Sequence, residues 1–299
     1  MSTRVAVIDL GSNATRLLIA DLHADGRIDE LERRSTVTRL GQGVDTAHAL
    51  APEAMERVYA ALAGYRQAID EHHADVAIGV LTSAVRDAAN GAEFTRTVNR
   101  RFGITARTIP GEEEARLTYL GATSEHTSDE PTAVIDVGGG STEVIVGAGT
   151  ELRFHVSTQV GVVRHSERHL HDDPPTAPQL AALREDAAAT FAEQVPPDLG
   201  ARKGIAVAGT ATQSAAMLRA DLLRRDALED LLAHLATLPL GERRTFPGLD
   251  PDRAPTIVAG LAILLEAMGA LGLAAVDASD DDILRGAVLE HRAFLEPRA

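Results

Sequence analysis

One short pattern occurs twice in this chain and constrains its fold more than any other feature. Residues 132–147 read TAVIDVGGGSTEVIVG, an apolar run that ends at an aspartate, then a glycine-rich turn and a second apolar run. Residues 5–20 read VAVIDLGSNATRLLIA and repeat this layout. Two runs of β-type residues around a glycine turn are typical of a strand, a tight turn and a returning strand. The repeat therefore indicates an internal duplication.

The two copies align residue by residue around the turn. The aligned pairs are Asp9 with Asp136, Gly11 with Gly138, Thr15 with Thr142 and Arg16 with Glu143. Glycines let a backbone approach an anion closely, and successive N–H groups can form a concave anion site. Asp136 and Glu143 would add carboxylates beside that site, where a metal-bound phosphate is usually met. The pattern thus predicts a two-lobed phosphate-binding protein.

Simpler interpretations of the glycine turn fit the sequence less well. A dinucleotide-binding fingerprint needs a helix after its glycines, whereas residues 143–146 continue as a strand. A Walker loop needs Gly-Lys-Ser/Thr, and the only lysine of the chain is Lys203. A plain hairpin would explain one copy equally well. The second copy, with its aspartate in register, favours phosphate binding.

Composition limits the partners that the chain can have. Its 299 residues suffice for two domains, and 44% hydrophobic with 24% charged residues is ordinary for a soluble globular protein. The net charge of −15 argues against a nucleic-acid or anionic membrane surface. A phosphate substrate would have to be attracted by local arginines, N–H groups and a cation. With no cysteine, disulfides, thiolate metal sites and thiol nucleophiles are excluded, which fits a cytoplasmic protein.

One stretch, residues 257–276, has about the length of a membrane span. Glu266 lies in its middle, and a carboxylate there costs roughly 3 kcal/mol on insertion scales. Gly269 and Gly272 follow. We therefore expect a helix, a turn and a strand here, and no membrane partner.

Periodicity and turn signals predict the remaining elements. Strands are expected at 27–40, 76–81, 104–109, 151–156, 204–208 and 273–277. Helices are expected at 52–73, 92–102, 175–195, from 111, from 161, from 213, over 218–244, from 257 and at 282–294. We expect the last helix to pack on the first lobe.

Charged residues after the strand at 76–81 and in the segment from Gly111 are candidates for chemistry. Arg86 follows that strand, where open α/β folds place ligand groups, and its planar fork could clamp a phosphate. It could equally pair with Asp87 or a neighbouring acid. The acids at 112–114 open a helix; they suit its dipole, and one of them could be catalytic.

Two weaker signals lie in the second half. Gly209-Thr210 follows a strand and opens a helix, whose N-terminus could bind an anion. His165, His169 and His171 have a spacing that a metal site permits. They lie near the end of an exposed-looking helix, which favours an interpretation without metal.

Taken together, these residues resemble the exopolyphosphatase/guanosine pentaphosphate phosphohydrolase (Ppx/GppA) family of the actin-like ATPase superfamily. The matching motifs, in chain order, are DLGSNATRL (9–17), TSAVRDA (82–88), GEEEARLTYLG (111–121), IDVGGGSTE (135–143), Gly209-Thr210 and PGLDPDRA (247–254). They extend over nearly the whole chain. The sequence departs from the family at Arg285-Gly286, where the family usually has an acid between the two, so Arg285 is assigned no role.

The resemblance implies an α/β fold with two RNase H-like lobes around a central cleft. The first lobe would span residues 1–117 plus 285–299, and the second residues 118–284. The implied activity is release of terminal phosphate from inorganic polyphosphate, with guanosine pentaphosphate as the alternative substrate. It also implies Mg²⁺ as cofactor, with Mn²⁺ as a second candidate, and a cytoplasmic homodimer.

The same resemblance implies a role for each motif residue. Glu114 would be the catalytic base, and the metal would be held by Asp136, Glu143 and Asp9. Phosphate contacts would come from Gly11, Ser12, Asn13, Arg86, Gly138, Gly139, Gly140, Ser141, Gly209 and Thr210. An actin-like sugar or acid kinase and a non-catalytic sensor of guanosine tetra- or pentaphosphate remain as alternatives. The complete set of acids favours a hydrolase over a sensor.

Overall fold

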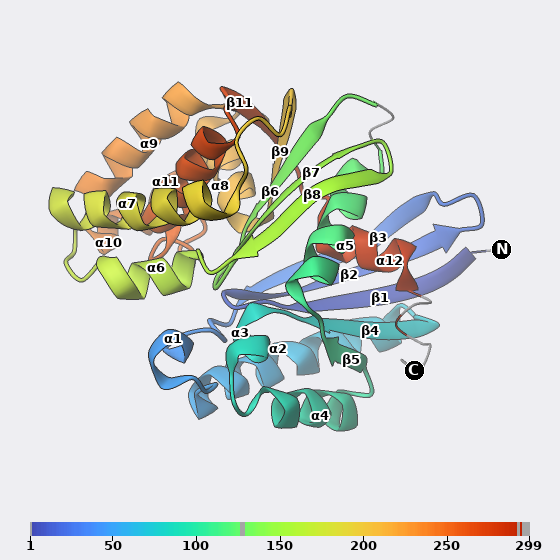
Figure 1. Cartoon of the computed structure of the whole chain (residues 1–299). Helices are drawn as coiled ribbons and strands as arrows, with labels where there is room; N and C mark the ends of the chain where they lie inside the picture. Colours follow the sequence, from blue (N-terminus) through green and yellow to red (C-terminus); the bar gives the residue numbers. More distant parts are fainter. Residues whose placement is uncertain (1, 126–128, 292–293, 295–299) are drawn as a thin grey trace. The chain divides into compact units, whose positions relative to one another are not determined.

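The chain divides into two compact α/β units in a computed structural model that describes residues 2–125, 129–291 and 294. Unit 1 comprises Met1–Gly121 and Ile283–Ala299, and unit 2 comprises Ala122–Asp282. Each unit contains its own sheet and its own helices (Figure 1). The lobe boundaries expected from the sequence lie within a few residues of these limits and stay a prediction.

Unit 1 is a sheet covered on both faces by helices. Its strands are β1 (Ser2–Leu10), β2 (Ala14–His23), β3 (Ile28–Val37), β4 (Val76–Leu81) and β5 (Thr105–Thr108), in the order β3-β2-β1-β4-β5. Its helices are α1 (Val44–Ala47), α2 (Pro52–Glu71), α3 (Ser83–Asp87), α4 (Gly91–Phe102), most of α5 (Gly111–Thr123), and α12 (Ile283–Leu289).

Alternation along β1 explains why both faces of this sheet are covered. Successive side chains of a strand point to opposite faces. Ala6, Ile8 and Leu10 share a buried cluster with residues of α2 and α4, whereas Val5 and Val7 share another with residues of α5 and α12. Figure 1 shows these two pairs of helices on opposite sides of the sheet. The expectation that the last helix packs on the first lobe is confirmed by the contacts of α12 with β1 and β2.

Unit 2 repeats this plan with additions. Its strands are β6 (Thr132–Val137), β7 (Thr142–Ala148), β8 (Glu151–Thr158), β9 (Lys203–Val207), β10 (Leu222–Arg224) and β11 (Ala275–Ala278), in the order β10-β11-β9-β6-β7-β8. Its helices are α6 (Val162–His169), α7 (Ala177–Gln194), α8 (Ala208–Leu218), α9 (Arg225–Thr237), α10 (Leu240–Arg243) and α11 (Ile257–Ala270).

The sheet topology confirms the internal duplication. Each sheet begins with an antiparallel meander, β1-β2-β3 in unit 1 and β6-β7-β8 in unit 2. A parallel strand then pairs with the first strand of the meander: β4 with β1, and β9 with β6. The next parallel strand is β5 in unit 1 and β11 in unit 2. β10 is an addition at the edge of the second sheet.

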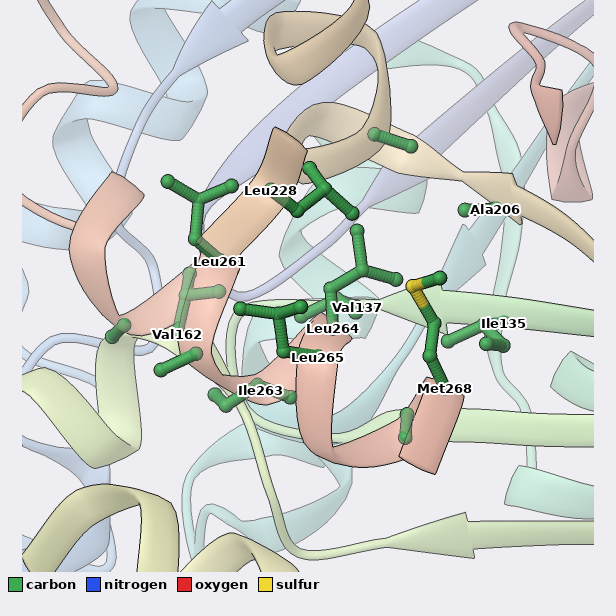
Figure 2. Packing of buried hydrophobic residues seen from close by; sticks show 14 of the residues in the cluster. Ile135, Val137, Val162, Ala206, Leu228, Leu261, Ile263, Leu264, Leu265 and Met268 are labelled. Carbon is green, nitrogen blue, oxygen red and sulfur yellow. The ribbon is translucent and has the colours of Figure 1, made fainter. Parts of the chain in front are cut away.

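Helix α11 is the core of unit 2, and its burial explains its apolar sequence. It contacts α6, α7, α8 and α9 as well as β6 (Figure 1). Figure 2 shows Leu264 and Met268 of α11 near Val137 and Ile135 of β6, all within one buried cluster. Its 14 residues span roughly 21 Å, shorter than a bilayer core. No helix among the described residues is long and apolar enough to span a membrane.

Two sequence-based expectations in unit 2 were wrong. The segment 218–244, expected to be helical, contains strand β10, which pairs with β11 about fifty residues later in the chain. Such a short strand exists only through this distant partner, so local periodicity does not reveal it. Helix α8 begins at Ala208 rather than near Gln213. Gly209 and Thr210, expected to lead into the helix, already belong to its first turn.

Close helix packing in unit 1 gives a stability prediction. A Cβ on Gly286 of α12 would lie 1.9 Å from the Leu117 carbonyl oxygen of α5, whereas one on Gly64 of α2 would meet nothing within 4 Å. We expect Gly286→Ala to destabilise the protein by about 1–3 kcal/mol through overpacking. The control Gly64→Ala should stabilise it by about 1 kcal/mol through helix propensity. Urea denaturation measures both, and equal effects would contradict the tight α12–α5 contact.

Candidate active site

In unit 1, the hairpin turn between β1 and β2 is joined to the start of α3. Gly11 N donates to Ala14 O at 3.1 Å and closes the turn. Ser12 Oγ lies 2.8 Å from Ser83 Oγ and accepts the Ala84 N–H at 3.2 Å. The structure therefore brings the first glycine motif together with the segment 82–88, as both phosphate-binding assignments require.

The carbonyl groups of this turn face the segment after β3. Ser12 O accepts the Gly41 N–H at 2.8 Å, and Asn13 O accepts the Thr38 and Arg39 N–H groups at 3.0 and 2.8 Å. A trans peptide unit directs its N–H opposite to its C=O. The N–H groups that follow Ser12 and Asn13 in the chain therefore point away from this segment, in a direction suited to an anion.

Asp9 and Arg16 form an ion pair across the first hairpin. They are register partners in the β1–β2 ladder. Arg16 Nε and Nη2 donate to Asp9 Oδ2 at 2.9 and 2.6 Å. The negative charge at the end of β1 is thus balanced within unit 1 itself.

The three glutamates at the start of α5 have different environments. Glu112 is exposed. Glu113 accepts a hydrogen bond from Arg107 Nη1 at 2.8 Å. Glu114 is buried, and Arg86 Nη1 donates to its Oε2 at 3.0 Å. Of the two roles considered for Arg86, a phosphate clamp and a pairing with an acid, the structure shows the pairing. Its partner is Glu114, the predicted catalytic residue.

In unit 2, the glycine loop between β6 and β7 is held by the N-terminus of α6. The N–H groups of Val162 and Val163 donate to Gly138 O at 2.9 Å and Gly139 O at 2.8 Å. Arg164 Nε donates to Gly140 O at 2.9 Å. Since all three carbonyls face α6, peptide planarity directs the N–H groups of the next three residues, Gly139 to Ser141, to the opposite side. The loop thus has the N–H arrangement of an anion site.

Asp136 and Glu143 place two buried carboxylates opposite each other. They are partners in the β6–β7 ladder, at the register occupied by Asp9 and Arg16 in unit 1. Their exposed fractions are 7% and 1%. Ser157, the next residue across the sheet, donates from Oγ to Glu143 Oε1 at 2.7 Å. Opposed like charges destabilise a ladder, whereas hard divalent cations take carboxylate oxygens. This donor set fits a cation such as Mg²⁺.

The start of α8 lies at the same edge of the unit 2 sheet as Asp136. Val207, the residue before α8, is the partner of Asp136 in the parallel β6–β9 ladder. A Cβ on Gly209 would lie 1.8 Å from Arg253 Nη1, so the missing side chain of Gly209 leaves room for this guanidinium beside the first turn of α8. Sequence reasoning assigned no role to Arg253. The only sequence signal was Gly209 itself, because the arginine that it contacts lies about forty residues later in the chain.

Two of the three histidines meet an acid that the sequence did not indicate. His165, His169 and Asp186 offer ligand atoms that all lie within 4.8 Å of one another. Asp186 is on α7, so only the packing of α6 on α7 reveals the group. His171 is exposed and is not a member of it.

Comparison with known proteins identifies the family. The model of the Ppx/GppA phosphatase family matches residues 18–291. Exopolyphosphatase 2 of Mycobacterium tuberculosis is 34% identical over 318 residues, covering 96% of this chain and 98% of that protein. Exopolyphosphatase 1 of the same organism is 28% identical, covering 96% and 87%.

Solved structures agree. A crystal structure of an exopolyphosphatase-like protein superposes with a TM-score of 0.88 at 33% identity, covering 99% of both chains. The Ppx/GppA family member of Aquifex aeolicus gives 0.80 at 27% identity, covering 100% of both. The chain therefore belongs to the Ppx/GppA phosphatase family and has its two-lobed, actin-like α/β fold.

Proposed function

We propose that this chain is an exopolyphosphatase, which releases terminal phosphate from inorganic polyphosphate. The observation that carries the proposal is the opposed pair of buried carboxylates in unit 2, Asp136 and Glu143. Relatives named exopolyphosphatase match 96% of the chain. Phosphoryl transfer needs positioned charge more than covalent chemistry, and this set of acids supports that requirement.

Glu114 is the proposed general base. The Arg86 guanidinium bonded to Oε2 orients the carboxylate, which would accept a proton from the water that attacks the terminal phosphorus in line with the leaving oxygen. Arg86 remains a candidate phosphate clamp as well, since its planar fork has five N–H donors and the bond to Glu114 uses one of its nitrogens.

The two turns are the proposed phosphate cradles. In unit 1, Gly11 permits the close approach. The proposed donors are the main-chain N–H group of Asn13, which planarity directs away from residues 38–41, and that of Ser12, which rests on the family motif alone. In unit 2 the proposed donors are the N–H groups of Gly139, Gly140 and Ser141, with Gly138 closing the turn. Gly209 and Thr210 would add the N-terminus of α8, where a helix attracts an anion.

Asp136 and Glu143 are the proposed ligands of a divalent cation, Mg²⁺ or else Mn²⁺. When bound, such a cation neutralises charge on the phosphate oxygens. Ser157 fixes the orientation of Glu143 through its hydrogen bond. Asp9 is the third candidate ligand. It is the weakest of the three, because Arg16 already donates to its Oδ2. A homodimer and a cytoplasmic location, implied by the resemblance, stay predictions.

A phosphate-release assay separates this proposal from its alternatives. The wild-type chain should release phosphate from polyphosphate with Mg²⁺ and without an acceptor. A chelator should abolish the release, because no cation would then offset the negative charges of the phosphates and the carboxylates. Guanosine pentaphosphate and ATP are the comparison substrates.

Each other outcome of that assay contradicts the proposal in a distinct way. Phosphate release from pentaphosphate alone would identify the other family activity. ADP formation that requires a sugar or acid acceptor would indicate a kinase. Tight binding of pentaphosphate without any turnover would indicate a sensor.

Substitution of the three α5 glutamates tests the proposed base. Glu114→Gln keeps the size of the side chain and removes the base, so kcat should fall by about 10²–10⁴-fold while KM changes little. The matched controls Glu112→Gln and Glu113→Gln should cost far less, since one side chain is exposed and the other pairs with Arg107. Small and similar losses in all three would mean that these acids only stabilise the helix start.

A further inference from the structure

His165 of α6 links the unit 2 glycine loop to Asp186 on α7. The ring is buried, and its Nδ1 accepts the Gly161 N–H at 3.3 Å. Gly161 in turn lies directly on the loop, because a Cβ there would come within 2.4–2.6 Å of the Gly139 and Gly140 backbone. One main-chain N–H therefore joins the histidine to the segment on which the proposed phosphate cradle rests.

The hydrogen bond fixes the tautomer of the ring. Burial lowers the pKa of His165 to about 4, so the ring is neutral at pH 7 and carries a single proton. Since Nδ1 accepts, that proton is on Nε2, which faces Asp186 Oδ2 at 3.5 Å. The same oxygen lies 2.8 Å from His169 Nε2 and 3.4 Å from Arg168 Nη1. The negative carboxylate thus favours the tautomer that leaves Nδ1 as an acceptor.

The same three ligand atoms could suggest a zinc site, since two histidines and an aspartate are ligands that zinc accepts. A histidine that binds a metal through Nε2 carries its remaining proton on Nδ1 and donates it to an acceptor. Here a donor, the Gly161 N–H, already points at Nδ1. The Arg168 guanidinium beside Asp186 also opposes a cation. The geometry fits a proton on Nε2 better than a metal.

We propose that His165 is a positioning residue for the phosphate cradle: as an acceptor it holds the Gly161 N–H, and so keeps the α6 N-terminus bonded to the carbonyls of the loop. Two further bonds, from Val162 N and Val163 N to Gly138 O and Gly139 O, depend on this placement. The effect on substrate binding rests on the proposed function, whereas the effect on the loop does not.

Two amide substitutions distinguish the role of Nδ1 from that of Nε2 in His165. His165→Asn places its amide oxygen where Nδ1 lies and should keep the Gly161 bond, whereas His165→Gln places its amide near Nε2 and should lose it. We expect His165→Asn to have a KM for polyphosphate close to wild type. His165→Gln should raise KM by about 3–10-fold, the scale of one lost hydrogen bond, and should change kcat less. Equal KM values for the two variants would reduce His165 to a packing role.

Hydrogen exchange of the Gly161 amide tests the inference without any substrate. Exchange should be as slow in His165→Asn as in the wild type and faster in His165→Gln, with unchanged exchange in β1 of unit 1 as the folding control. If the wild type releases no phosphate, the proposed function fails while this comparison still decides the role of His165. Equal exchange in the two variants would overturn that role.

Two further measurements test the tautomer of His165 and the alternative of a metal site. Nitrogen-15 NMR should show an unprotonated Nδ1 in His165, and a proton on Nδ1 would overturn the inference. Zn²⁺ added alone should shift the unfolding temperature of the wild type and of His165→Asn equally, because any Zn²⁺ held by Asp136 and Glu143 is common to both. A rise that His165→Asn abolishes would identify a metal site in place of the positioning role.

Discussion

The antiparallel register of two hairpins governs most of the chemistry of this chain. Each ladder places the next-to-last residue of the first strand opposite a residue near the start of the second strand. In unit 1 this opposes Asp9 to Arg16, and the charges cancel. In unit 2 it opposes Asp136 to Glu143, and two buried carboxylates share one position of the sheet. The same fold element thus yields a neutral ion pair in one copy and, in the other, the carboxylate pair that we propose as the cation ligands.

Around these pairs, carbonyl groups of each turn bond to neighbouring segments, which directs the N–H groups of the residues that follow them to the opposite side. In unit 1 the carbonyls face residues 38–41, and in unit 2 they face α6. The supports differ in kind. Ser12 joins the first turn to α3 through its hydroxyl, whereas Gly161 and His165 join the second to α6 and α7. A change in such a support should therefore alter substrate binding more than the chemical step.

The sequence predicted the parts of this arrangement that are local or repeated. The duplicated hairpin needed only two apolar runs around a glycine-containing turn, and the family resemblance indicated Glu114 among three adjacent acids. Contacts made through tertiary packing were not predictable. Nothing local shows that Asp186 would meet His165, that Arg253 would lie against Gly209, or that residues 222–224 pair with β11. The different environments of Glu112, Glu113 and Glu114 likewise depend on arginines from other elements.

Equilibrium binding of Mn²⁺, followed by its electron spin resonance signal, tests the division of labour between the hairpins most directly. The wild-type chain should bind the ion, and Asp136→Asn should weaken binding by at least about 10-fold, a loss that even outer-shell changes can cause. Asp9→Asn, the aligned change in unit 1, should cost much less because Arg16 already engages Asp9. Equal losses in the two variants, or unchanged binding in Asp136→Asn, would contradict the assignment of the cation to unit 2.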